Sequence, residues 1–212
     1  LQLICDLCKE HDAFAICDEV YEHLVFDGAV HRPLMTFEGM RERTVRIGSA
    51  GKTFSLTGWK VGYITGPSTL LDPIGKAHQW VTFTTPPNLQ RAVAYGLRKE
   101  DSYYQDLALD LAQKRDRMTK GLEAIGFSVL PCEATYFLTC GFEKLGLGSA
   151  DVEVCQRLVT EAGVAAVPVS AFYGGNAPTG FIRFCFCKQD WVIDEALARL
   201  SAFLTAAHSE SA

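Results

Sequence analysis

The sequence predicts an α/β fold, in which part of a mostly parallel, helix-flanked sheet is followed by a smaller C-terminal α+β domain. In the first half, short apolar runs alternate with longer amphipathic stretches, as in chains whose strands and helices follow one another. In the second half, short strands come in closer succession before and after a helix. The 212 residues are 48% hydrophobic and 21% charged, an ordinary globular composition that is long enough to form a substantial core.

The first half contains three predicted strands, which are apolar runs bounded by glycine or polar residues: 13–17, 44–48 and 60–66. The first of them, AFAIC, is a continuous apolar run, which is typical of a strand buried on both faces. Apolar spacing of three and four predicts helices over 1–12, 68–82, 86–98 and 102–125. The third helix is entered through Pro86-Pro87, where proline is tolerated, and Gly126 ends the fourth.

The second half contains four further predicted strands, within FSVL, TYFLTC, VAAVPV and FIRFCFC: 127–130, 135–140, 164–169 and 181–187. Two amphipathic stretches, 150–162 and 190–207, are predicted helices. We expect a partial large domain over residues 1–97 and a small C-terminal domain over residues 98–212. No internal repeat or low-complexity tract is visible.

The composition excludes several classes of function. The net charge is −5 and the basic residues are scattered, so we expect no nucleic-acid partner. No apolar run reaches the length of a membrane-spanning helix, so we expect no membrane partner.

Eight cysteines stand mostly in apolar runs, where a thiol behaves as a small hydrophobe. Cys5 and Cys8 form one CxxC without a second pair at metal-site spacing, so we expect buried, reduced thiols and no metal site. A reducing intracellular compartment follows, with the cytoplasm expected. A mitochondrial or plastid location stays open, because the chain begins at Leu1 inside a helical pattern with no targeting segment to read.

The stretch SAGKTFSLTGWKVG, residues 49–62, raises the question of what Lys52 does. A phosphate-binding P-loop needs a glycine five residues before the glycine that precedes the lysine. That position is Arg46, whose side chain would replace the residue that lets the loop turn. The sequence therefore argues against a P-loop.

Three chemical groups follow the first two predicted strands. Asp18 ends the first strand, Tyr21 comes three residues later, and Lys52 follows the second strand. Ligand sites of open α/β sheets lie beyond the carboxyl ends of strands. A lysine amine, a carboxylate and a phenol there match the needs of pyridoxal phosphate, whose aldehyde, pyridine nitrogen and 3′-oxygen each require such a partner.

The whole chain resembles class I aminotransferases of fold type I, and within them the kynurenine and methionine aminotransferase group. The resemblance is carried by DEVYEHLVFDG, GSAGKTFSLTGWKVG, KRDRM, VPVSAFY and FIRFCFCK, and runs from Leu1 almost to the C-terminus. It implies that Lys52 forms a Schiff base with pyridoxal 5′-phosphate and that Asp18 pairs with the pyridinium nitrogen. It further implies that Tyr21 bonds the 3′-oxygen and that Ser49 and Lys60 hold the phosphate, Lys60 standing where many relatives carry arginine.

The resemblance also implies three substrate-binding residues. Arg183 corresponds to the arginine that binds the substrate α-carboxylate, Phe83 to an aromatic side chain lent to the neighbouring subunit, and Tyr136 lies in a segment near the substrate. The residues themselves support Arg183, because a guanidinium in a strand of Phe, Ile and Cys needs an anion.

Each residue taken alone has a structural alternative. Arg183 could pair with an internal carboxylate, and Asp18 could cap a helix over the following VYEHL. Tyr21 and Phe83 could be core residues. Ser49 could be an ordinary loop residue, and Lys60 a solvated charge at the start of a strand.

The resemblance predicts a homodimeric transaminase that moves an amino group from an L-amino acid of the kynurenine, methionine, glutamine or aromatic type to a 2-oxo acid. β-Elimination of cysteine S-conjugates is an expected side activity. The family's N-terminal half, which supplies cofactor contacts and neighbouring strands, has no counterpart in these residues. The 212-residue chain is therefore expected to be a fragment, or a truncated non-catalytic form that binds partner subunits at most, and to be inactive when isolated.

Overall fold

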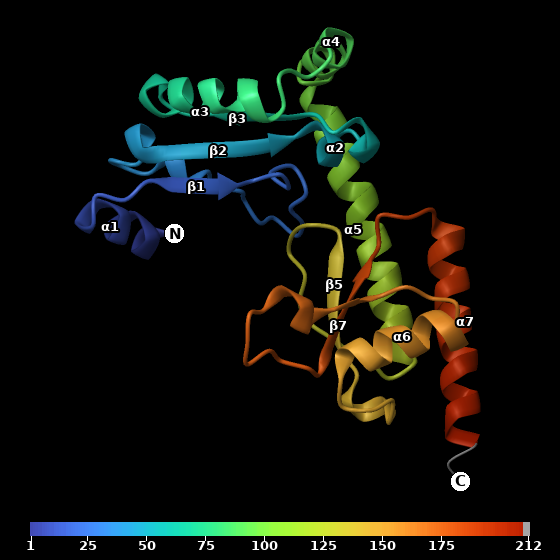
Figure 1. The fold of residues 1–212 in the computed structure, drawn as a ribbon. Helices are drawn as coiled ribbons and strands as arrows, with labels where there is room; N and C mark the ends of the chain where they lie inside the picture. The colour runs from blue at the N-terminus through green and yellow to red at the C-terminus, as the bar shows by residue number, and fades with distance from the viewer. Residues whose placement is uncertain (210–212) are drawn as a thin grey trace. The chain divides into compact units, whose positions relative to one another are not determined.

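The computed structural model describes residues 1–209, and Figure 1 shows its helices and strands. The chain divides into two compact units, the first covering residues 1–107 and the second residues 108 onward. Each unit has its own sheet. This division falls inside the long helix α5 (Asp101–Ala124), whereas the sequence-based domain boundary at residues 97 and 98, which remains a prediction, precedes that helix.

The first unit contains a three-stranded sheet in the order β1-β2-β3. Its strands are β1 (Ala15–Asp18), β2 (Thr44–Ser49) and β3 (Gly62–Thr65). β1 and β2 are parallel, and the register sets Asp18 opposite Ile47, so that the C-terminal ends of both strands lie at the same end of the sheet (Figure 1). β3 pairs with β2 antiparallel. The α/β class is confirmed, and this part of the sheet is mixed.

A glycine in β2 makes room for a tyrosine of β3. Gly48 and Tyr63 are cross-strand partners, and a Cβ atom on Gly48 would lie only 2.2 Å from the Tyr63 ring. A glycine in a strand allows this kind of close approach. The Tyr63 ring can therefore lie across the backbone of β2.

The helices of the first unit flank this sheet: α1 (Gln2–Glu10), α2 (Ala50–Thr53), α3 (Ser68–Val81) and α4 (Pro87–Gly96). α1 packs its two cysteines, Cys5 and Cys8, into a small core with Ala15, Leu34 and Met40. The CxxC is thus part of the core, as expected for small apolar side chains.

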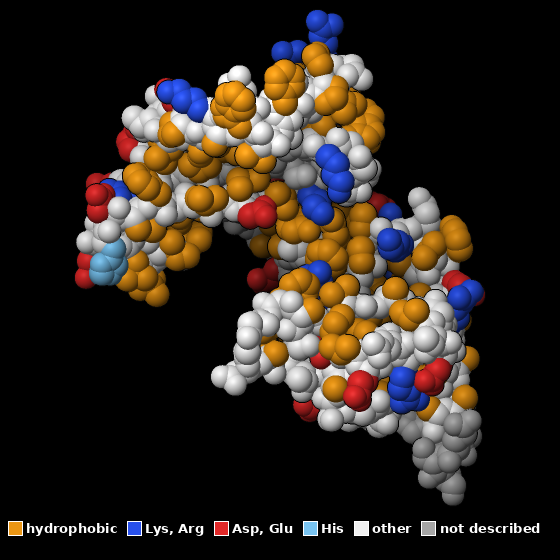
Figure 2. Space-filling view, in the orientation of Figure 1, with side chains coloured by type: hydrophobic (Ala, Val, Ile, Leu, Met, Phe, Trp, Pro, Cys, Tyr) orange, Lys and Arg blue, Asp and Glu red, His pale blue; other side chains and the backbone are white. Residues whose placement is uncertain are grey.

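The first strand, whose apolar run is typical of burial on both faces, exposes one face in these 212 residues, which agrees with the expectation that its neighbouring strands have no counterpart in them. Ala15 is buried, but Ile16 is 74% exposed and the neighbouring Phe14 is 64% exposed. The reason is that β1 is an edge strand with only β2 beside it, and nothing within the described residues covers its second face. Figure 2 shows many hydrophobic side chains on the visible surface of the region of α3 and this sheet.

The second unit contains an antiparallel sheet in the order β4-β5-β7-β6. Its strands are β4 (Ser128–Val129), β5 (Phe137–Gly141), β6 (Val167–Pro168) and β7 (Phe181–Cys185), and its helices are the second part of α5, α6 (Asp151–Glu161) and α7 (Asp190–Ser209). In β7 the side chains alternate, so that Ile182 and Phe184 are buried while Arg183 lies on the opposite, half-buried face.

The helices of the second unit cover one face of its core. In α5, Leu111, Met118 and Leu122 are buried at helical spacing. A Cβ atom on Gly121 would lie 2.3 Å from a methyl carbon of Leu197, which indicates a close approach of α5 and α7. The boundaries of the longer predicted helices agree with the structure to within about two residues.

Three absences concern the described residues alone. None of their helices is long and apolar enough to cross a membrane. No group of three or more metal-binding side chains occurs among residues 1–209. The structure records no disulfide there; Cys187 is exposed, which departs from the expectation of buried thiols because it lies just beyond β7.

Candidate active site

Lys52 lies in the short helix α2, which begins directly after β2 ends at Ser49. Its side chain is half-buried, and its Nζ atom lies 5.7 Å from the centre of the Tyr21 ring. That distance is within the range of a cation–π contact. The structure thus brings together two of the residues that the sequence assigned to a cofactor.

A cavity of about 320 Å³ lies beside Lys52. Its lining residues come from the end of β2, from α2 and from the segment that leads into β3: Ser49, Gly51, Lys52, Thr57, Lys60, Val61 and Gly62. Two lysines and two hydroxyl-bearing residues, Ser49 and Thr57, therefore line one small space. Lys60 adopts a left-handed backbone conformation (φ 55°, ψ 43°) immediately before Val61.

Gly51 keeps this cavity open. A Cβ atom at this position would lie 3.0 Å from the Cα atom of Thr57 and 3.4 Å from Oγ of Ser49. Any side chain would therefore crowd the backbone of Thr57 and touch the Ser49 hydroxyl. The space that glycine leaves, bordered by cations and a hydroxyl group, fits a phosphate monoester.

Asp18 is the last residue of β1 and is exposed. Residues 20–23 form a turn rather than a helix, so the interpretation of Asp18 as a helix cap is wrong. The turn is closed by the backbone, with Leu24 N–H donating to the Tyr21 carbonyl at 2.8 Å. The parallel register places Asp18 at the same end of the sheet as Ser49 and α2.

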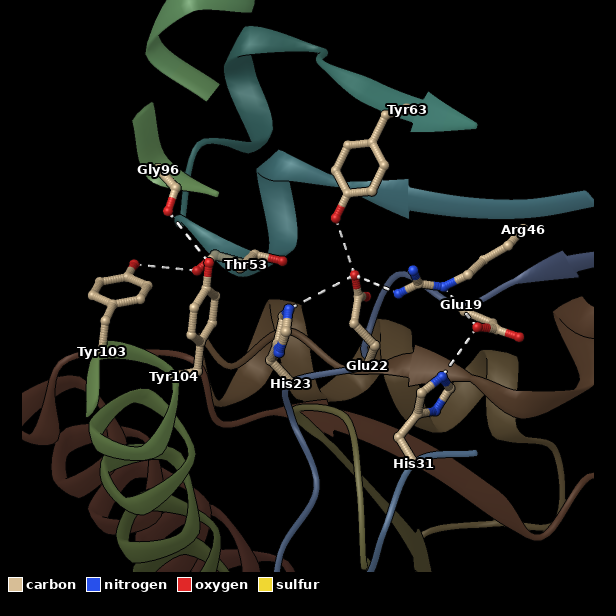
Figure 3. Close-up of polar contacts among 10 residues, drawn as sticks. All are labelled: Glu19, Glu22, His23, His31, Arg46, Thr53, Tyr63, Gly96, Tyr103 and Tyr104. Carbon is tan, nitrogen blue, oxygen red and sulfur yellow. Dashed lines mark hydrogen bonds and ion pairs between the residues drawn. The ribbon is translucent and has the colours of Figure 1, made fainter. Parts of the chain in front are cut away.

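A network of polar side chains, of which Glu22 is buried and the others half-buried, lies behind this turn (Figure 3). Arg46 of β2 donates from Nε to Glu19 Oε2 at 2.8 Å, and its Nη2 lies 3.1 Å from Glu22 Oε1. His31 Nε2 lies 3.1 Å from the same Glu19 oxygen, and Leu34 N–H donates to the other oxygen at 3.2 Å. One guanidinium thus fixes two carboxylates of the segment that carries Tyr21.

Tyr63 completes the network from β3. Its hydroxyl donates to Glu22 Oε1 at 3.0 Å. Burial raises the pKa of Tyr63 to about 12, and the Glu22 carboxylate adds to the rise, so the phenol stays protonated and remains a donor. Glu22 is 8% exposed, and its Oε2 atom has no hydrogen-bond partner among the described residues.

Two tyrosines at the beginning of α5 contact α2 and the turn formed by residues 20–23 (Figure 3). Tyr103 donates a hydrogen bond to the carbonyl of Thr53, the residue after Lys52, at 3.2 Å. The Tyr104 ring lies 4.2 Å from the His23 ring. Burial lowers the pKa of His23 and so favours the neutral imidazole, while the Glu22 carboxylate has a smaller, opposing effect. These contacts restrict the two segments that bear Tyr21 and Lys52.

In the second unit, Arg183 is held between two aromatic rings. The guanidinium carbon lies 4.1 Å from the centre of the Phe137 ring and 4.5 Å from that of Phe172. Its Nε atom is buried and has no hydrogen-bond partner among residues 1–209, and no described carboxylate forms an ion pair with it. The internal ion pair considered from the sequence is therefore not seen.

The remaining two predicted residues differ in their surroundings. Phe83 is 74% exposed with a left-handed backbone (φ 68°), so the core-packing alternative for this residue is wrong. It lines a cavity of about 660 Å³ in the first unit together with Lys60 and Gly62. Tyr136 is buried in the second unit, with its ring 4.6 Å from that of Phe137.

Sequence reasoning missed the residues that support the site. They are Glu19, Glu22, His31, Arg46, Tyr63, Phe137 and Phe172. One signal was present: Arg46 is a guanidinium inside the apolar strand TVRIG, the same pattern that identified Arg183. Its two acidic partners stand in the adjacent DEVYEH segment.

Comparison with known proteins identifies the family of the chain. Residues 1–200 match the family model described as aminotransferase class I and II, and the chain belongs to that family. The chain is 41% identical over 210 residues to a probable N-succinyldiaminopimelate aminotransferase, DapC, from Mycobacterium tuberculosis, covering 95% of this chain and 53% of the relative. It is 40% identical over 190 residues to the methionine aminotransferase of Escherichia coli K12, covering 90% and 49%. A kynurenine–oxoglutarate transaminase of Dictyostelium discoideum is 38% identical over 218 residues, covering 92% and 50%.

Solved structures give the same result for the fold. The N-succinyldiaminopimelate aminotransferase of Mycobacterium tuberculosis superposes with a TM-score of 0.91 at 42% identity, covering 94% of this chain and 52% of the other. YbdL of Escherichia coli, whose structure identified a methionine aminotransferase function, superposes with a TM-score of 0.88 at 39% identity, covering 94% and 52%. The chain thus has part of the fold type I aminotransferase fold, and it spans about half the length of these relatives.

Proposed function

We propose that the protein containing this chain is a pyridoxal-phosphate-dependent transaminase in which Lys52 holds the cofactor as a Schiff base. The observation that carries the proposal is the cavity beside Lys52, where Ser49 and Lys60 gather with the space kept by Gly51. A phosphate monoester attached to an aromatic aldehyde fits a site that offers cations, a hydroxyl group and one amine near a phenol ring. Family membership supports the same reaction class.

Each residue of the site has a distinct task in this proposal. Ser49 and Lys60 bind the phosphate, and Tyr21, whose ring lies over Lys52, donates to the 3′-oxygen. Asp18, at the end of β1, keeps the pyridine nitrogen protonated. When bound, the cofactor supplies the electron sink that makes loss of the substrate Cα proton possible.

Lys52 then moves the proton. With the cofactor held in the site, the Lys52 amine would take the proton from the substrate Cα as a general base and would return it as a general acid. Tyr103, bonded to the carbonyl next to Lys52, keeps α2 in place during that transfer. Arg183 binds the substrate carboxylate, an anionic partner that its half-buried guanidinium does not have among residues 1–209.

The proposed substrates are based on the relatives of the chain and not on the shape of the cavity beside Lys52. We propose an L-amino acid of the kynurenine, methionine, glutamine or aromatic type as amino donor and a 2-oxo acid as acceptor, in a homodimer. Succinyldiaminopimelate is a further donor, because a relative named for it matches as well as the others. Cysteine S-conjugate β-elimination is a side activity in this proposal, since loss of the same Cα proton allows a thiol to leave.

A second candidate is a truncated chain without catalysis. The exposed apolar side chains of Phe14 and Ile16 favour it for the 212 residues in isolation. Such a chain would bind partner subunits at most. The two candidates differ in turnover, which the following substitutions measure in the protein that contains the whole chain.

Lys52→Ala is expected to abolish transamination, because the amine that holds the cofactor and moves the proton is gone. Lys60→Ala is expected to weaken pyridoxal phosphate binding but to leave turnover measurable at saturating cofactor. Lys120→Ala, which removes an exposed lysine of α5, is the matched control and should behave as the unsubstituted protein. Near-normal turnover of Lys52→Ala would refute the assignment.

A further inference from the structure

One of the two cation–π contacts of Arg183 is made by Phe172, whose ring is not packed in the core. Phe137 belongs to β5, where Thr139 is the direct cross-strand partner of Arg183. Phe172, in contrast, lies in the short 3₁₀ turn Val169–Phe172 and is 59% exposed. An exposed ring at 4.5 Å from a guanidinium needs its backbone fixed by another contact.

That contact is made by Asp151. Its side chain is 1% exposed, and both oxygens are used by one residue: Oδ2 accepts from Ser170 N–H and Oδ1 accepts from Ser170 Oγ–H, each at 2.7 Å. Hydrogen bonds to a buried carboxylate are among the stronger ones in proteins. Asp151 is also the first residue of α6, where the helix dipole favours a negative charge.

The hydrogen bonds from Ser170 to Asp151 also restrict Phe172, because Ser170 and Phe172 belong to the same short turn. Ser170 is two residues before Phe172, and the Ser170 carbonyl accepts from Tyr173 N–H at 3.1 Å, which closes the turn around Phe172. Fixing Ser170 from both its amide and its hydroxyl therefore fixes the position of the ring. No described residue of the cofactor cavity takes part, so the arrangement belongs to the second unit alone.

We propose that Asp151 is a positioning residue for carboxylate binding, because through Ser170 it holds the Phe172 ring against the Arg183 guanidinium. The ring then shields the guanidinium from water and fixes its orientation. The inference rests on the proposed function in that Arg183 receives the substrate carboxylate. The second ring keeps water from the guanidinium, and a partly desolvated guanidinium binds a carboxylate more tightly. Asp151 itself touches no reacting atom.

The test uses the full-length protein with cofactor and measures the dissociation constants of 3-phenylpropionate and of its uncharged amide by calorimetry. Phe172→Leu removes the ring face, and Asp151→Asn and Ser170→Ala weaken the restraint. Ser170→Thr keeps the hydroxyl group. Asp190→Asn, at the first position of α7 and exposed, is the control for losing a charge at a helix start.

We expect Phe172→Leu to weaken phenylpropionate binding about threefold to tenfold, and Asp151→Asn and Ser170→Ala by smaller factors, with amide binding unchanged. Ser170→Thr should restore the affinity, and Asp190→Asn should leave it as it was. In turnover assays KM for amino acid and oxo acid should rise together while kcat stays within about twofold.

The inference is overturned if Asp151→Asn leaves the phenylpropionate constant unchanged, whatever Phe172→Leu does, if acid and amide weaken equally, or if the unsubstituted protein does not bind the acid. Should any of these occur while borohydride still fixes the cofactor to Lys52, the proposed function stands without it. A carboxylate-specific loss in a protein that does not attach the cofactor would support the inference and remove the proposed function.

Discussion

Two mostly apolar strands, one in each unit, lie in opposite environments. β1 reads AICD after Phe14, and β7 reads FIRFC. In β1 the side chain of Ile16 is 74% exposed, whereas in β7 Ile182 and Phe184 are 0% and 1% exposed. The difference lies in the neighbours: β7 has a strand on each side and helices of its own unit to cover it, and β1 is an edge strand paired only with β2.

The comparison teaches that an apolar run predicts a strand but not its burial. Burial requires a second layer, and the chain spans only about half the length of its relatives. In the second unit, residues of the same unit bury the apolar side chains of β7. In the first unit, apolar side chains of β1 remain exposed to solvent. An exposed apolar edge strand is a recognised cause of self-association.

The largest expected effect comes from the core of the second unit. Phe184→Ala in the 212-residue chain should lower the free energy of unfolding by about 3–5 kcal/mol, because it empties the space beside Phe127. Ile16→Ala in β1 should change it by less than about 0.5 kcal/mol, since the side chain is already in water. Urea denaturation of both variants measures the difference, and similar losses would show that β1 is covered in solution.

The second prediction asks whether the first unit nevertheless has a rigid centre. Arg46→Met leaves Glu19 and Glu22 buried without their shared cation, which should cost up to about 3–5 kcal/mol. Arg117→Met breaks two exposed ion pairs, with Asp190 and Asp194, and should have a much smaller effect because water screens them. Equal denaturation midpoints for the two variants would contradict the network.

The smallest expected effect is a change with pH. The pKa of Tyr63 rises from its usual 10 to about 12 on folding, so folding favours the protonated phenol. Its contribution is fully present below pH 10 and is lost as the pH rises toward 12. Tyr63→Phe should remove this part of the alkaline loss of stability, as followed by denaturation midpoints between pH 9 and 12. An identical pH profile for the variant would contradict the Tyr63–Glu22 hydrogen bond.

The sequence predicted the order and type of the main elements because hydrophobic period and Gly or Pro boundaries act locally. It placed Asp18 at the end of a strand and Tyr21 and Lys52 after strands, because strand ends are marked locally; the cofactor roles of these residues remain a proposal. The support of the site was not predictable in the same way: Arg46 meets Glu19 and Glu22 across 24 or more residues of chain, and Phe172 reaches Arg183 from another turn. Such contacts between residues distant in sequence depend on strand register and turn geometry, which local sequence patterns do not encode.

The attachment of the cofactor tests the central claim most directly. Lys52 and Lys60 line the same cavity, and only Lys52 is assigned the covalent bond. The full-length protein should be treated with pyridoxal phosphate, reduced with sodium borohydride, digested, and mapped by mass spectrometry. Our account predicts loss of the visible absorbance and a pyridoxyl group on Lys52 alone. A stable modification of Lys60 in place of Lys52, or no site-specific modification, would contradict it.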